Sequence, residues 1–177
     1  MDSNCGVVWC LRLAAFVIVV LPLNCLSQTA PTRPVNEILA WISAHLGPVM
    51  ETYKDGSSAE HVSSITWNNC SLTVKTVTAE SMGKTRTETV TLNLQGLRPD
   101  KIDTRTERGE LVIKTISAVT ARYEVDIGAD LDHARDYDID AIYLYVSKNE
   151  DTLSRMKHAW HDAIVACGGK EIPENLY

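Results

Sequence analysis

The sequence lacks the short motifs that carry the common catalytic chemistries. It has no Gly-x-Ser-x-Gly turn of a serine hydrolase and no glycine-rich phosphate loop. No internal repeat or low-complexity block is visible either. Positive charge is scarce, because 17 lysines and arginines face 23 aspartates and glutamates and the net charge is −6. This balance argues against nucleic acid or an anionic membrane as the main partner, since both favour a basic surface.

A long hydrophobic run is also missing. Residues 13–23 are apolar but have the length of a secretory signal, which is too short to span a bilayer. Cys25 and Ser27 are small enough for the −3 and −1 positions of a signal peptidase site. We therefore expect residues 1–27 to be a cleaved signal peptide, which predicts a secreted or periplasmic protein with no membrane span after cleavage. Lipidation of Cys25 is the alternative, but Asn24 stands where a lipobox normally has Gly or Ala.

Export changes the meaning of the five cysteines. Cys5, Cys10 and Cys25 belong to the leader, so the mature chain keeps only Cys70 and Cys167. An even pair in an oxidising compartment predicts a disulfide. The alternative is two buried free thiols, while a metal site is poorly supported because no histidine lies close in sequence to either cysteine.

The mature chain has the size of one domain. Residues 28–35 contain two prolines and no periodicity, and we expect them to form an exposed lead-in. A single α+β domain is expected over residues 36–170, followed by a flexible tail at residues 171–177.

An amphipathic helix is expected from about residue 148 to 167. Its apolar residues recur at three- and four-residue steps and form one stripe: Leu153, Met156, Trp160, Ala163, Ile164 and Cys167. Ser147 and Glu150 have the spacing of a capping box, and Gly168-Gly169 supplies the left-handed conformation that ends a helix. Because such a stripe needs a surface to cover, it predicts a sheet.

A second amphipathic helix is expected over residues 36–46, ended by Gly47-Pro48. Between the helices the hydrophobic period changes to two, which predicts strands joined by short turns and paired antiparallel. Seven strands are expected: 62–67, 70–78, 86–94, 101–106, 111–116, 122–127 and 139–146. The predicted fold is α+β, with an antiparallel seven-strand bent sandwich or partly open barrel, a C-terminal covering helix and an extra N-terminal helix.

Seven short strands followed by one amphipathic helix form an element order that resembles the pleckstrin-homology-like superfold, over roughly residues 62–167. The turn at residues 67–70, the Pro99-Asp100 passage and the ending at residues 163–170 are similar to small exported bacterial proteins of no assigned function. The first resemblance implies a bent sandwich or barrel closed by its helix. The second implies no activity.

The stretch 126–140 is conspicuously acidic and suggests calcium. Asp136, Asp138 and Asp140 match the first half of an EF-hand loop, but Ala141 stands where the glycine should follow and Ser147 where the glutamate should. In an extended chain the three carboxylates share one face, where repulsion means that they are solvated or share a cation. A solvated rim and a weak Ca²⁺ site are therefore the two interpretations, and the rim is preferred.

Other candidate groups have structural explanations. His158, His161 and Asp162 lie near one another on the last helix, but a metal would need further ligands. His45 stands at a helix C-terminus, where a histidine commonly interacts with the dipole. Tyr143-x-Tyr145 is either a half-buried outer face or a ligand-facing pair.

These features favour an exported, non-enzymatic domain that binds a peptide, a protein or a small apolar ligand, without a cofactor. One alternative is an enzyme whose site is assembled from dispersed residues near the acidic stretch 126–140. The other is a structural subunit of the envelope. Fold alone does not decide among them.

Overall fold

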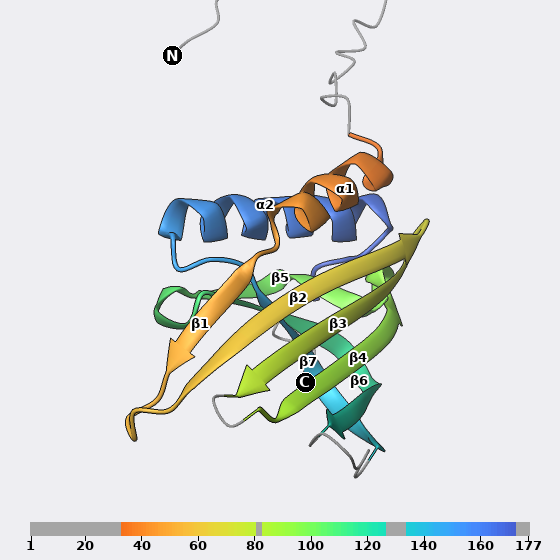
Figure 1. Cartoon of the computed structure of the whole chain (residues 1–177). Coiled ribbons are helices and arrows are strands. Elements are labelled where there is room, and N and C mark those ends of the chain that lie inside the picture. The colour runs from red at the N-terminus through yellow and green to blue at the C-terminus, as the bar shows by residue number, and fades with distance from the viewer. Residues whose placement is uncertain (1–32, 81–82, 127–133, 173–177) are drawn as a thin grey trace, which may run out of the picture. The chain divides into compact units, whose positions relative to one another are not determined.

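The structure is a computed structural model of the chain and describes residues 33–80, 83–126 and 134–172. This part of the chain folds into an α+β domain (Figure 1). Its helices are α1 (Val35–His45) and α2 (Glu150–Ala166). Its strands are β1 (Pro48–Thr52), β2 (Ser58–Asn68), β3 (Ser71–Glu80), β4 (Thr85–Asn93), β5 (Leu97–Arg105), β6 (Glu110–Asp126) and β7 (Arg135–Tyr145), and two 3-10 turns are η1 (Leu94–Gly96) and η2 (Thr106–Arg108). The expected signal peptide at 1–27 and most of the lead-in lie outside the described residues.

The seven strands form one antiparallel sheet in the order β1-β2-β3-β4-β6-β5, with β7 paired to β6. The long strand β6 lies at its centre and pairs with three other strands. Residues 110–115 of β6 pair with β5, residues 121–126 pair with β4, and β7 pairs along both stretches. The expected antiparallel α+β fold is confirmed.

The end of β7 returns to β2, so the sheet curls on itself. The backbone N–H of Tyr145 donates to Ser63 Oγ at 2.9 Å, and the N–H of Val146 donates to the carbonyl of Gly109 at 2.8 Å. Gly109 has a φ of 64°, and a Cβ there would lie only 2.9 Å from Val49 Cγ1. Only glycine fits this crossing point without strain. The curl makes one face of β2–β4 concave.

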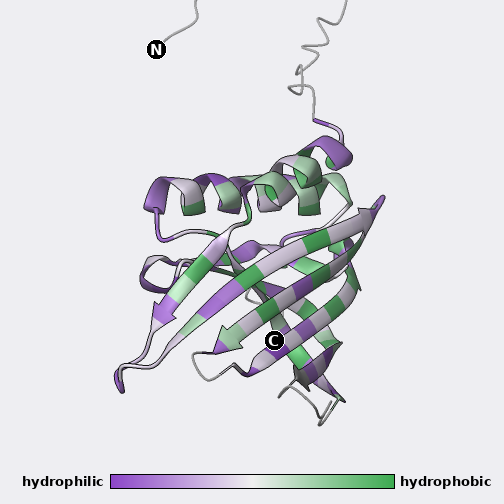
Figure 2. Cartoon of the chain, in the orientation of Figure 1, coloured by the Kyte–Doolittle hydropathy of each residue, from purple (hydrophilic) through white to green (hydrophobic). Residues whose placement is uncertain are grey.

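Residues of the concave face line up in rows that cross β2, β3 and β4, because paired residues share a face. The two rows that pack with the helices, which we call the apolar rows, are Trp67, Leu72 and Leu92, then Ile65, Val74 and Val90. The next two, which we call the polar rows, are Ser63, Thr76 and Glu88, then His61, Thr78 and Arg86. The two-residue period is visible as alternating bands in Figure 2.

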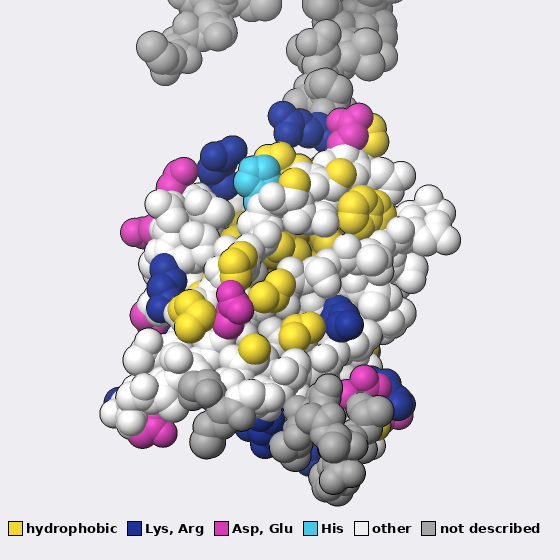
Figure 3. All heavy atoms as spheres, viewed as in Figure 1, with side chains coloured by type: hydrophobic (Ala, Val, Ile, Leu, Met, Phe, Trp, Pro, Cys, Tyr) yellow, Lys and Arg dark blue, Asp and Glu magenta, His cyan; other side chains and the backbone are white. Residues whose placement is uncertain are grey.

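Both helices cover the apolar end of the curl (Figure 1). The predicted stripe of α2 is confirmed, since its six side chains are all buried. Helix α1 contributes Ile38, Leu39 and Ile42 to the same core. Neither helix, nor any other in the described ranges, is long and apolar enough to cross a membrane. The convex face of the sheet carries exposed apolar side chains, including Met50 and Val62. In Figure 3 apolar side chains are scattered among polar ones on the surface.

The predicted and the observed sheets both have seven strands, but only because one strand was missed and another was predicted as two. Strand β1 is absent from the predicted set, because Gly47-Pro48 was expected only to end α1, whereas Pro48 also begins a strand. Proline is tolerated as the first residue of an edge strand. The strands expected at 111–116 and 122–127 are one strand, β6, whose pairing with β7 shifts register between Lys114 and Val119. The irregular residues at the register shift interrupt the two-residue hydrophobic period, and such an interruption predicts a turn from sequence alone.

The sequence predicts the C-terminal end of α2 correctly but not its N-terminal cap. The capping box of Ser147 and Glu150 is wrong: Asn149 is the N-cap, and its Oδ1 accepts from the N–H of Thr152 at 3.0 Å. The C-terminal glycines act as predicted. Gly168 has a φ of 87°, and the Gly169 N–H donates to the carbonyl of Ile164, five residues earlier, at 2.9 Å.

A disulfide joins Cys70 to Cys167, as the sequence predicts, with Cα atoms 5.7 Å apart. It ties the β2–β3 turn to the end of α2. Beyond it, the carbonyl of Ile172 accepts from Arg98 Nη2 at 3.1 Å, so the start of the expected tail contacts β5. Residues 173–177 lie outside the described part of the chain.

Candidate ligand-binding pocket

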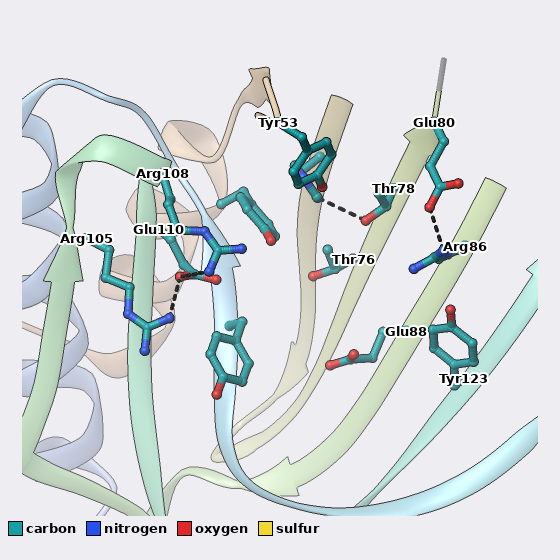
Figure 4. A pocket seen from close by; sticks show the side chains of 13 residues that line it. Tyr53, Thr76, Thr78, Glu80, Arg86, Glu88, Arg105, Arg108, Glu110 and Tyr123 are labelled. Atoms are coloured by element: carbon teal, nitrogen blue, oxygen red, sulfur yellow. Dashed lines mark hydrogen bonds and ion pairs between the residues drawn. The ribbon is translucent and has the colours of Figure 1, made fainter. Parts of the chain in front are cut away.

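A cavity of about 440 Å³ opens at the polar rows of the concave face. Its walls come from β2, β3 and β4 on one side and from β6, β7 and the turns around η2 on the other (Figure 4). Its volume lies within the range of about 300–1,000 Å³ that is typical of small-molecule sites. Its lining is polar and aromatic, which sets it apart from the adjoining apolar core.

His61 forms the floor of the pocket next to β1. Its side chain is buried, and its Nδ1 lies 3.0 Å from Thr78 Oγ1. Its ring stacks on Tyr145 with centroids 4.0 Å apart. Burial lowers the pKa of His61, and the carboxylate of Glu51, 3.3 Å from Nε2, opposes this shift. The imidazole is therefore neutral at pH 7, and Nε2 makes no hydrogen bond of good geometry with any described residue.

Glu110 is a buried carboxylate on the opposite wall, only 2% exposed. Arg105 Nη1 donates to its Oε2 at 3.1 Å, and Arg108 lies at 3.9 Å from the same oxygen. Arg108 also donates through Nε to Glu51 at 3.1 Å. Burial raises the pKa of Glu110, and the two arginines partly offset that shift. The two arginines thus neutralise two carboxylates.

A third ion pair lies across the cavity. Arg86 Nη2 contacts Glu80 Oε1 at 2.7 Å, whereas Arg86 Nε is buried without a hydrogen-bond partner in the described part of the chain. Glu88, in the next row, accepts a hydrogen bond of 2.6 Å from the hydroxyl of Tyr137. Burial and this bond to Glu88 raise the pKa of Tyr137, so the phenol stays protonated. On this wall Arg86 is therefore paired with a carboxylate, whereas Glu88 is held by a hydrogen bond from a neutral phenol.

Four tyrosine rings surround the cavity. Tyr53 and Tyr143 are 41% and 37% exposed at its rim, and Tyr123 is half-buried. Figure 4 shows Tyr53 and Tyr123 on different sides of the opening. Burial, and then the charge of Glu110, raise the pKa of Tyr145 to about 12. Within the described ranges the hydroxyls of these four rings make no hydrogen bond to another residue, and the two exposed rings, Tyr53 and Tyr143, are the ones open to a ligand.

The structure places the predicted acidic candidates elsewhere. Asp136, Asp138 and Asp140 are exposed on one face of β7 and do not line the pocket. Arg122 lies 3.7 Å from Asp136, and Thr120 Oγ1 donates to Asp138 at 3.3 Å. Residues 127–133 of the acidic stretch lie outside the described residues. Over the described ranges, no three His, Cys, Asp or Glu side chains gather closely enough to hold a metal ion.

The predicted histidine candidates also have local contacts. His161 Nδ1 lies 3.3 Å from Asp162 Oδ1, and both are on the surface of α2 with His158. His45 Nδ1 lies 2.7 Å from the carbonyl of Trp41, and the two rings stack 4.0 Å apart. This contact is the helix-end role expected for His45. By contrast, Tyr143 and Tyr145 both line the cavity.

Sequence reasoning missed the other pocket residues, although a signal exists. Thr76 and Thr78 continue the alternation of the buried Leu72 and Val74, in the same phase. Polar residues that continue a buried phase mark an inward polar face. On β4 the charged pair at residues 86 and 88 precedes Val90 in the same way.

No family model, curated protein or solved structure matches the chain. The resemblances to the pleckstrin-homology-like superfold and to small exported bacterial proteins stay predictions.

Proposed function

We propose that the protein is an exported, non-enzymatic binding domain that holds a small polar molecule in the pocket of the concave face. The observation that carries the proposal is the break between the apolar rows and the polar rows on one continuous surface. A domain that only needed a core would extend the apolar rows, because buried polar side chains cost free energy unless they are paired. The polar lining narrows the sequence-based expectation, which included apolar ligands.

The side chains of the pocket are held in place before any ligand arrives. Thr78 is fixed by His61, and Thr76 Oγ1 lies 3.2 Å from Ser63 Oγ. Ser63 in turn accepts from the backbone of Tyr145 across the curl. Such supporting contacts reduce the ordering cost of binding. They support recognition of one defined ligand shape.

Export is part of the proposal and rests on two features. The first is the signal-like segment 1–27 with its small residues before the cleavage position. The second is the Cys70–Cys167 disulfide, which persists in oxidising compartments. Intact-mass analysis of the protein from its native source should show residues 1–27 removed. Retention of these residues would contradict the export proposal.

A matched pair of variants tests the pocket. Thr76→Phe fills the cavity from β3, whereas Thr73→Phe places the same ring on the convex face of the same strand. Each substitution removes one hydroxyl–hydroxyl contact, of 3.2 Å and 3.0 Å respectively. In a thermal-shift screen of small polar molecules, we expect ligands that stabilise the wild type and Thr73→Phe but not Thr76→Phe. Equal stabilisation of both variants would place the site elsewhere.

An enzyme is the second candidate, and one observation favours it. Thr78, His61 and Glu51 form a hydroxyl–imidazole–carboxylate line, with gaps of 3.0 Å and 3.3 Å. A neutral imidazole in such a line can accept a proton from a hydroxyl nucleophile. Hydrolysis of small esters that is lost in Thr78→Val would support this function. Unchanged hydrolysis in Thr78→Val would exclude Thr78 as the nucleophile.

A further inference from the structure

Every arginine that lines the pocket is paired with a carboxylate. Arg86 pairs with Glu80, Arg105 pairs with Glu110, and Arg108 pairs with Glu51. The remaining carboxylate of the lining, Glu88, accepts a hydrogen bond from the Tyr137 hydroxyl. An anionic ligand would compete with a glutamate for its arginine, and a cationic ligand would compete with an arginine for its glutamate or with the Tyr137 hydroxyl for Glu88. Each exchange breaks an existing contact of a partly buried group, which costs free energy. A neutral ligand leaves every pair intact.

The pocket nevertheless offers both kinds of hydrogen-bonding group. Arginine N–H groups donate, carboxylate oxygens accept, and tyrosine hydroxyls do both. The rim adds two exposed tyrosines, Tyr53 and Tyr143, whose hydroxyls can donate and accept. A ligand that brings several acceptors and donors on a small frame would match this mixture of groups.

Aromatic faces complete the chemistry. The Tyr53 ring at the rim makes no ring contact with any other described residue, and its exposed fraction is 41%. The Tyr143 ring, on the opposite wall, has Arg105 5.9 Å from its centroid and is 37% exposed. A tyrosine presents an apolar face beside a polar tip. Its natural complement is a ring with an apolar C–H face and a rim of hydroxyls.

We propose that the ligand is a neutral saccharide, bound with its sugar ring against Tyr53 or Tyr143 and its hydroxyls among the paired charges. This inference rests on the proposed function, because it names the ligand class of the same pocket. It excludes an acidic or basic metabolite as the preferred ligand. It also assigns the ion pairs a role as fixed donors and acceptors, rather than as counterions for a charged ligand.

Three probes of one shape test the class: glucose is neutral, glucuronate carries a negative charge and glucosamine a positive one. Neutral mono- and disaccharides of glucose, galactose and N-acetylglucosamine complete the set. The purified protein, with its disulfide formed, is titrated while backbone amide signals are followed by NMR. We expect at least one neutral sugar to shift the signals of Thr76 and Thr78. Its charged counterparts should bind at least about tenfold more weakly, because they disturb an ion pair.

Variants at the rim separate ring contact from hydrogen bonding. Tyr53→Ala and Tyr143→Ala remove exposed rings without opening the core, and we expect at least one to weaken sugar binding about fivefold or more. The matching Phe variant should restore most of the affinity, since it keeps the ring face. Met50→Ala, on the exposed convex face, is the control and should bind like the wild type.

Two outcomes overturn the inference in different ways. Tighter binding of glucuronate, glucosamine or another charged molecule at the same amides would refute the saccharide class while leaving the pocket as a binding site. Absence of any shift at these amides, with the sugars and with the polar screening set alike, would refute the binding function itself. If sugars shift other amide signals, and if their affinity is unchanged in both Tyr→Ala variants, the saccharide site does not lie in this pocket.

Discussion

The apolar rows and the polar rows of the concave face lie on the same three strands, in the same alternation, and yet form a core and a pocket. On β3 the change falls between Val74, which is 3% exposed, and Thr76, which lines the cavity. The neighbouring strands change at the same row, from Ile65 to Ser63 and from Val90 to Glu88. Coverage explains the difference, because both helices pack over the apolar rows only. One sheet face can therefore support stability at one end and recognition at the other.

The largest effect is expected at the apolar end, from loss of the disulfide. Replacing Cys70 and Cys167 by serine should lower the free energy of unfolding by about 4 to 5 kcal/mol in the chain-entropy account, because the bridge closes a long loop of 97 positions. Urea denaturation of the oxidised protein and the double variant measures it. A loss below about 1 kcal/mol would show that strain or residual structure cancels the constraint.

A hydroxyl in an apolar row should be costly. Val74→Thr keeps the shape of the side chain but buries a hydroxyl in the apolar core, and we expect a loss of about 1 to 3 kcal/mol. Val77→Thr is the matched control on the other face of β3, where we expect a change within about 0.5 kcal/mol. Equal losses in the two variants would mean that coverage by the helices does not distinguish the faces.

The reverse exchange in a polar row should cost less. Thr76→Val removes the contact with Ser63 Oγ, and we expect a loss of about 0.5 to 1.5 kcal/mol by the same denaturation experiment. Ser63 keeps its bond from the Tyr145 N–H, so no group is left wholly unpaired. If Thr76→Val stabilised the protein instead, the polar row would be a site retained at the expense of stability.

The smallest effect is expected in the pH dependence. The pKa of His61 is lowered in the folded protein, so the unfolded chain binds the proton more tightly. The contribution of His61 to stability is therefore complete above its unfolded pKa of about 6.5 and declines as pH falls below it. His61→Gln should lose less stability than the wild type between pH 7 and pH 5, in parallel denaturation series. Parallel curves would contradict the assignment of a buried neutral imidazole.

Local pattern was enough to predict the helices, the sheet and the disulfide. The α2 stripe and the position of Cys167 within it follow from helix periodicity, which needs only nearby residues. Strand register is different, since it depends on partners far along the chain. His61 meets Thr78 only because β2 and β3 pair in one particular register. For this reason the polar rows could not be assembled from the sequence.

The alternation on β2 was also misleading near the pocket. Val62 is apolar but 40% exposed, whereas its polar neighbours His61 and Ser63 are each 4% exposed. A hydrophobicity pattern would place Val62 on the buried face and its two polar neighbours on the exposed face, which is the reverse of the structure. The conspicuous charges were interpreted correctly, because Asp136 and Asp138 were expected to form a solvated rim and are exposed on β7. The error on β2 therefore concerns which face is covered and not the local structure.

The disulfide also affects how the protein would respond to proteolysis. Cys70 and Cys167 are separated by 97 positions, and β3 through α2 lie between them. A single backbone cut anywhere in that span leaves two fragments joined through sulfur, with a high effective concentration of one for the other. A nicked chain therefore has a route to remain assembled until it is reduced. In a compartment rich in proteases but poor in thiols, the bridge would preserve the pocket as well as the fold.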